Sequence, residues 1–137
     1  MRLSSNSAAE LLYCLNVFPD ASPGGFSREI LPGLKQIKQK LSPNRPMGLG
    51  LRFSEDQLLE LEDPARREQW LDELRRAAMY GVTFNAFPYG TFHGERVKEQ
   101  VYAPDWRSRA RLDYTLRAAR LLAESMREEG TLSLIHI

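Results

Sequence analysis

Three short apolar runs, spaced almost evenly along the chain, are the feature that most constrains its fold. They begin at residues 11, 47 and 81, so their starts are 36 and 34 residues apart. A helical pattern follows each run, and repeated strand–helix units of this length are typical of parallel strands joined by right-handed crossovers. The nearly continuous apolar character of the runs suits strands that are covered on both faces. The sequence therefore predicts an α/β protein with three consecutive βα units and parallel strands.

Each of the three predicted helices has its own boundary signals. The first, over residues 30–41, carries an apolar face and has a proline near its start. The second opens with a capping box at Ser54, restarts at Asp63, and is expected to end at Gly81. Its predicted apolar stripe is Trp70, Leu71, Leu74, Ala77 and Ala78. The third is expected to begin at an Asp105 cap and to turn its arginines to water. Its predicted core side is Leu112, Leu116, Ala119, Leu122, Ala123 and Met126.

Two architectures fit this succession of units: an open doubly wound sheet, or the first part of a (β/α)8 barrel. No G-x-G-x-x-G follows the first strand and no Walker A motif occurs, so a nucleotide-binding doubly wound sheet is disfavoured. A complete barrel usually needs about 250 residues, so a chain of this length holds about three of the eight units. We therefore predict the N-terminal part of a truncated (β/α)8 TIM barrel.

The two ends of the chain differ from its middle. Residues 1–9 are short, polar and small, which predicts a flexible lead-in, and residues 10–130 form the predicted partial TIM-barrel domain (βαβαβα). Residues 132–137 (LSLIHI) look like the translation of a sequencing-library adapter end. We therefore expect residues 131–137 to be a non-native, adapter-derived tail; the alternative is a natural strand.

Composition and charge exclude several classes of protein. No apolar run approaches the roughly 18–20 residues of a membrane-spanning helix, and residues 1–6 lack the apolar core of a signal peptide. The net charge of +1 comes without a basic tract, so there is no electrostatic footprint for nucleic acid. The single cysteine, Cys14, cannot form an internal disulfide and fits a reducing compartment. We expect a cytoplasmic protein that neither binds nucleic acid nor inserts into a membrane.

Ligand-binding residues are expected where the strands end, because both architectures bind ligands at the carboxyl ends of parallel strands. Asn16 follows the first strand, Arg52 the second and Asn85 the third. Arg52 could hold an anionic group through two parallel hydrogen bonds. Asn85 interrupts an apolar run and needs a partner if it is buried. We predict all three as substrate-binding residues.

The connection after the third strand, residues 88–104, is longer than the usual two to six residues and is rich in aromatic, glycine and charged residues. Binding loops often have this character. We predict Tyr89 and Lys98 as substrate-binding residues, and His93 and Glu99 as catalytic ones. Imidazole also binds metals, so His93 is the candidate metal ligand. A divalent metal such as Zn or Mn needs three or four convergent ligands, so the other ligands would have to lie elsewhere in a full-length protein.

Each candidate residue also has a purely structural interpretation. His93 fits a hydrogen-bonded structural histidine, and Lys98 and Glu99 fit a surface ion pair. Cys14 lies in a predicted buried strand, which suits a small core residue better than a nucleophile. The sequence leaves these alternatives open.

Three segments together resemble a known family. They are residues 13–19 (YCLNVFP), 45–52 (RPMGLGLR) and 85–106 (NAFPYGTFHGERVKEQVYAPDW). In this order the chain resembles the metabolite traffic protein EboE family over about residues 10–130, although that family commonly has histidine at the position of Phe18. Its members look like TIM-barrel proteins related to xylose isomerase-like sugar isomerases and endonucleases. They are encoded with proteins implicated in moving a secondary-metabolite precursor out of the bacterial cytoplasm.

The resemblance implies a TIM-barrel protein of bacterial secondary-metabolite precursor processing or traffic, present as an N-terminal fragment that is inactive alone. Its partners would be a small-molecule metabolite and other proteins of the same operon. One alternative is a metal-dependent sugar-phosphate isomerase or epimerase, or a related hydrolase, whose metal polarises a carbonyl and whose other catalytic residues lie outside this fragment. A second alternative is a non-catalytic small-molecule-binding scaffold. Fold analogy does not choose among them.

Overall fold

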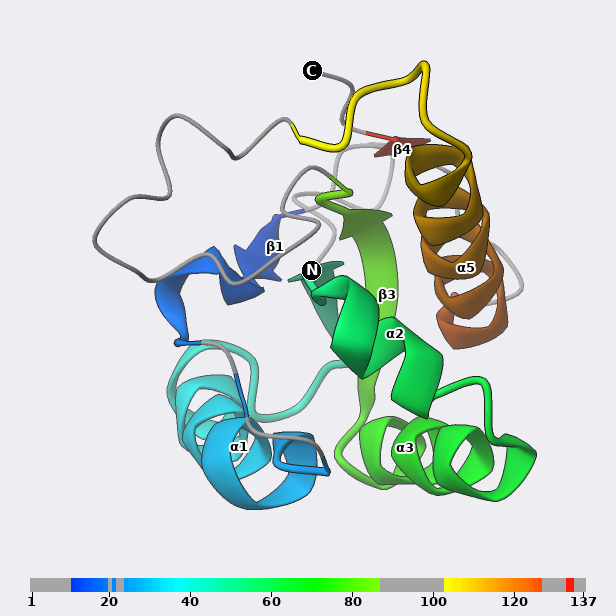
Figure 1. Cartoon of the computed structure of the whole chain (residues 1–137). Helices are drawn as coiled ribbons and strands as arrows, with labels where there is room; N and C mark the ends of the chain where they lie inside the picture. The colour runs from blue at the N-terminus through cyan, green and yellow to red at the C-terminus, as the bar shows by residue number, and fades with distance from the viewer. Residues whose placement is uncertain (1–10, 20, 22–23, 87–102, 127–132, 135–137) are drawn as a thin grey trace.

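A computed structural model of the chain describes residues 11–19, 21, 24–86, 103–126 and 133–134. At its centre is a parallel sheet in the order β1 (Leu12–Cys14), β2 (Met47–Leu51), β3 (Met79–Phe84) and β4 (Ser133–Leu134). The helices around it in Figure 1 are α1 (Leu31–Leu41), α2 (Glu55–Glu60), α3 (Pro64–Arg76) and α5 (Arg109–Ser125). Two shorter elements are a 3-10 turn, η1 (Leu15–Val17), and a π-helical turn, η2 (Phe26–Ile30). The predicted α/β class with parallel strands is confirmed.

The strands are joined by the predicted succession of helices. The turn η2 and helix α1 connect β1 to β2, and α2 and α3 connect β2 to β3. Helix α5 follows β3, and the backbone of β4, which falls within the predicted tail, pairs with β3 through Thr83 and Phe84. No helix within the described ranges is long and apolar enough to cross a membrane.

The core lies between the sheet and the helices. Leu49 and Leu51 of β2 are fully buried, and Phe53 packs edge-on to Trp70 of α3 with ring centroids 5.7 Å apart. Phe53 also packs against Phe84 at the end of β3, at 6.0 Å. Edge-to-face aromatic contacts contribute about 0.5–1.5 kcal/mol beyond burial. This aromatic cluster fixes the end of the sheet where β2 and β3 stop.

Two predicted boundaries around β1 and β3 are wrong. The first run forms strand only over Leu12–Cys14 and then turns into η1. Gly81 does not end the second helix: α3 ends at Arg76, and exposed Ala78 takes the left-handed backbone (φ 51°) that turns the chain into β3. Gly81 lies inside β3, where an added Cβ would come 2.2 Å from Ser125 Oγ of α5. The glycine therefore serves the close approach of helix and strand, not the end of a helix.

The predicted core side of α5 is wrong in part. Leu112 and Leu116 are 40% and 43% exposed, and Ala123 is also exposed, whereas Leu122 is buried as predicted. The buried residues of α5 are Arg111, Tyr114, Ala118, Leu121, Leu122 and Ser125. The helix has two apolar stripes, and hydrogen bonds from buried polar groups decide which stripe packs inward.

The expectation that the arginines of this helix face water is also wrong, because Arg111 is 5% exposed. Asp105 is not the helix cap: it accepts a hydrogen bond from the Arg107 N–H in the preceding turn, and Ser108 precedes the first helical residue.

Candidate functional site

The predicted residues Asn16, Arg52 and Asn85 lie at the carboxyl ends of β1, β2 and β3. The strand register places Cys14 beside Gly50, and Gly50 beside Thr83, in one row across the sheet. The three predicted residues follow two positions later on each chain segment. The backbone N–H of Asn85 still donates to the Leu51 carbonyl at 2.8 Å, which extends the β2–β3 ladder to this level.

Asn85 joins the first unit to the third. Its side chain is 7% exposed, and its Nδ2 donates to Asn16 Oδ1 at 2.9 Å and lies 3.4 Å from Cys14 Sγ. Because β2 lies between β1 and β3, this contact joins the segments that follow β1 and β3 across the end of β2. The structure therefore brings two predicted site residues into direct contact, and the partner that a buried Asn85 requires is Asn16.

Arg52 is buried at the same edge of the sheet. Its side chain is 5% exposed, and Nη2 donates to the carbonyl of Phe18 at 3.0 Å. The bond ties the end of β2 to the segment that follows η1. A buried guanidinium and two carboxamides thus follow the ends of three neighbouring strands. A positive charge with directional donors at this edge suits an anionic or strongly polar small molecule.

Sequence reasoning missed Thr83 and assigned Cys14 only to the core. Thr83 is 5% exposed, and its Oγ1 has no hydrogen-bond partner within the part of the chain that the structure describes. Cys14 is half-buried and faces Asn85. A buried polar group without a partner needs an explanation, and a ligand or water at this edge supplies one. The signal in the sequence was the hydroxyl side chain of Thr83 among the apolar residues that precede Asn85.

The other predicted site residues, Tyr89, His93, Lys98 and Glu99, lie outside the described residues. The described residues that flank them are held by one side chain: Arg111 donates from Nη1 to the Ala86 carbonyl and from Nε to the Pro104 carbonyl, both at 2.8 Å.

The described donors at the sheet edge do not fit a divalent metal. They are two carboxamides, a hydroxyl, one thiol and a guanidinium whose positive charge opposes a bound cation. Within residues 11–86 and 103–134, as far as the structure describes them, no three His, Cys, Asp or Glu side chains gather as metal ligands do. Zinc and manganese bind to clusters of His, Cys, Asp or Glu side chains, and the described residues at this edge do not form such a cluster.

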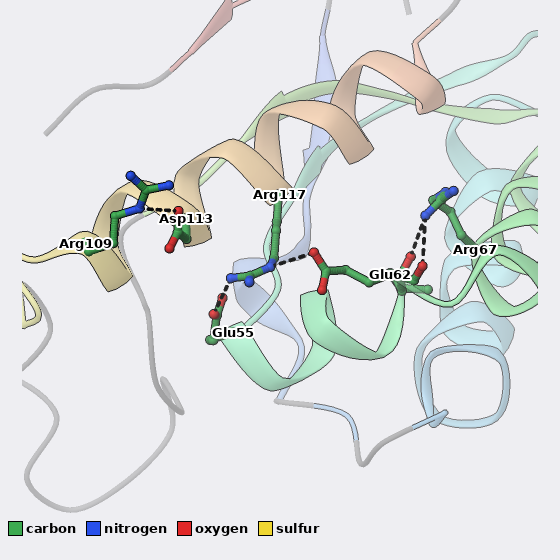
Figure 2. Close-up of polar contacts among 7 residues, drawn as sticks. Glu55, Glu62, Arg67, Arg109, Asp113 and Arg117 are labelled. Atoms are coloured by element: carbon green, nitrogen blue, oxygen red, sulfur yellow. Dashed lines mark hydrogen bonds and ion pairs between the residues drawn. The ribbon is translucent and has the colours of Figure 1, made fainter.

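A second charged cluster lies on the helix side. Arg117 of α5 lies between two carboxylates, as Figure 2 shows, and donates to Glu55 at 2.6 Å and to Glu62 at 2.9 Å. Glu55 is 9% exposed, and its second carboxylate oxygen has no partner within the described residues. Burial raises the pKa of the Glu55 carboxyl above its ordinary value, and the nearby Arg117 charge opposes this rise without cancelling it. The arrangement connects α2 and the turn that follows it to α5.

A pocket between η2, α2 and α3 lies apart from the sheet edge. Its charged groups are already paired, because Glu60 accepts a hydrogen bond from the Gly24 N–H at 2.6 Å and forms an ion pair with Arg66. Its aromatic lining is Phe26, Phe53 and Trp70. None of the predicted site residues lines this pocket.

Comparison of the chain with protein-family models, with curated proteins and with solved structures finds no match to any of them.

Proposed function

We propose that the chain is the N-terminal part of a cytoplasmic TIM-barrel protein that binds a small polar or anionic metabolite at the carboxyl edge of its sheet. The observation that carries the proposal is the contact of Asn85 with Asn16 across the end of β2, at the edge of the sheet where Arg52 is also buried. Carboxyl edges of parallel strands are where α/β proteins bind ligands, because the connecting loops bring side chains of different strands together there.

The barrel interpretation is supported by crowding on the sheet face that carries Gly48 and Gly50. A Cβ at Gly48 would lie 2.7 Å from Val82 Cγ2, and a Cβ at Gly50 would lie 2.9 Å from Leu12 Cδ1. Side chains of neighbouring strands thus close in over the central strand. A sheet that is concave on this face, as the inside of a barrel is, produces such crowding.

The biological setting of the proposal comes from the resemblance to the metabolite traffic protein EboE family. We propose a role in processing or traffic of a secondary-metabolite precursor, with other proteins of the same operon as partners. As about three of the eight units of a barrel, the chain supplies the binding residues at its own strand ends, and the residues that would decide between catalysis and binding lie in the other units.

The test is a titration of the 15N-labelled chain followed by the side-chain amide signals of Asn16 and Asn85. Ribose 5-phosphate, ribose and inorganic phosphate serve as separate probes, so that an anion requirement and a hydroxyl requirement are distinguished. We expect saturable shifts with at least one probe, and a dissociation constant raised at least about tenfold by Asn16→Ala or Arg52→Lys.

Asn44→Ala changes an exposed turn residue before the amino end of β2, opposite the edge that carries Asn16, Arg52 and Asn85. It is the matched control and should bind like the unaltered chain. The proposal fails if none of the probes gives a saturable shift, or if Asn16→Ala binds as tightly as Asn44→Ala.

A further inference from the structure

We infer that the outer stripe of α5 is a self-complementary surface on which a second copy of this chain docks with its own α5 antiparallel. The stripe consists of Leu112, Leu116, Ala119 and Ala123. Their 4-3-4 spacing places them on one helical face. Both leucines and Ala123 are exposed, and Ala119 is half-buried. Apolar side chains in a row at a helix surface are the usual form of a helix docking site.

The other faces of α5 are occupied. Tyr114 donates its hydroxyl to the Phe53 carbonyl at 2.9 Å, which holds one face on the sheet. Arg117 pairs with Glu55 and Glu62, and Glu124 pairs with Arg67 of α3 at 3.0 Å, which holds a second face on α2 and α3. In Figure 1, α5 stands at the right of the view, with α2 to its left and α3 below. The stripe therefore lies on the side that no described element covers.

The order of large and small residues in the stripe favours a second copy in antiparallel orientation. With a two-fold axis between residues 117 and 118, Leu116 faces the second copy's Ala119, and Leu112 faces the second copy's Ala123. Each large side chain then meets a small one, which lets the two helices approach closely. A parallel pair would stack leucine on leucine and leave a gap between the alanines.

Charges beside the stripe are complementary in the same orientation. Arg120 is exposed and makes no ion pair within the described residues. Asp113, which pairs with the exposed Arg109 at 3.0 Å, lies on the same flank of the helix. In an antiparallel pair, Arg120 comes within about two residues, or roughly 3 Å along the axis, of the level of the second copy's Asp113. Two symmetric ion pairs would therefore flank the apolar contact. Because the stripe is short, the expected dimer is weak and depends on concentration.

The test is sedimentation velocity of the full chain over a roughly hundredfold range of concentration. We expect a monomer–dimer equilibrium that Leu116→Glu weakens at least about tenfold. Leu41→Glu, which changes a 59% exposed leucine of α1, is the matched control and should leave the equilibrium unchanged. Thermal unfolding followed by circular dichroism confirms that both variants are folded.

The variant Ala119→Leu distinguishes the specific antiparallel dimer from nonspecific association of apolar surfaces. It places leucine against the second copy's Leu116, so it should weaken the antiparallel dimer although it makes the stripe more apolar. Stronger association of this variant overturns the inference. So does association that Leu116→Glu leaves intact, or a monomer at every concentration, which would leave the stripe to a further helix of a longer polypeptide.

Discussion

Arg111 and Tyr114 of α5 are both almost fully buried, and both donate to backbone carbonyls of residues that lie outside the strands and helices. Tyr114 donates to Phe53, while Arg111 donates to Ala86 and Pro104 and lies 5.5 Å from the centre of the Tyr114 ring. Burial raises the pKa of the Tyr114 phenol, so this hydroxyl keeps its proton and its role as donor. Backbone carbonyls that are withdrawn from water need donors, and these two side chains supply them.

Replacing Arg111 should therefore destabilise the protein more than replacing an exposed arginine of the same helix does. Arg111→Met keeps much of the packing but leaves two carbonyls without charged donors, and we expect a loss of about 2–4 kcal/mol in the free energy of unfolding. Arg109→Met removes an exposed arginine paired with Asp113 and should cost less than about 1 kcal/mol. Urea denaturation measures both. Equal effects of the two substitutions would contradict the role given to Arg111.

At the scale of elements, the junction between α3 and β3 carries backbone strain. Ala78 has φ 51°, a conformation that glycine adopts readily and that costs other residues free energy. Its carbonyl accepts a hydrogen bond from the Met47 N–H at 3.0 Å, so the strained residue also fixes the start of β2 against β3. The backbone adopts this conformation because the chain must turn from α3 into β3 at Ala78 for β3 to pair with β2.

Ala78→Gly should relieve the strain and stabilise the protein by about 0.5–1 kcal/mol, because the exposed methyl group contributes little packing. Ala77→Gly, one residue earlier with φ −82°, should instead destabilise by a similar amount. The two variants form a matched pair for chemical denaturation. A destabilising Ala78→Gly would show that the left-handed backbone carries no cost here.

At the scale of the whole molecule, the buried carboxylate of Glu55 makes stability depend on pH. Its pKa is raised by burial, so the native state binds the proton at a higher pH than the unfolded chain does. For a carboxyl with a raised native pKa, the ionised form costs stability at neutral pH. That cost disappears as the pH falls through the native pKa towards the ordinary value near 4.5.

Comparison with Glu55→Gln isolates this contribution. Between pH 7 and about pH 5, the free energy of unfolding of the unaltered chain should rise relative to that of the variant, because only the former gains a proton at residue 55. Arg117 keeps its bond to Glu62 in the variant, so α2 and α5 stay connected. Denaturation at several pH values gives the difference. A difference that is constant with pH, or that changes in the opposite direction, would show that the pKa of Glu55 is not raised.

Much of the fold could be read from local patterns, because apolar runs, proline positions and capping residues act over a few residues. The capping box at Ser54 and the cap at Asp63 are present as predicted, with Ser54 and Asp63 accepting from the backbone N–H groups of Gln57 and Arg66. For the candidate site, the ends of the three apolar runs in the sequence were enough to predict that Asn16, Arg52 and Asn85 share one edge of the sheet. The Asn85–Asn16 hydrogen bond and the burial of Arg52 depend on how neighbouring strands meet. So does the Thr83 hydroxyl, which has no hydrogen-bond partner among the described residues.

By itself, the sequence determined the α/β class, the order of strands and helices and the edge of the sheet at which polar residues gather. Spacing, propensity and caps are local properties, and each strand–helix unit carries its own. Only the tertiary structure decided which stripe of α5 packs inward, why Gly81 lies in a strand and which arginine is buried. Those outcomes depend on contacts between residues far apart in the chain: the Ser125 side chain against Gly81, and the Ala86 and Pro104 carbonyls at Arg111. Two apolar stripes on one helix look alike in sequence until the buried donors select the stripe that faces the sheet.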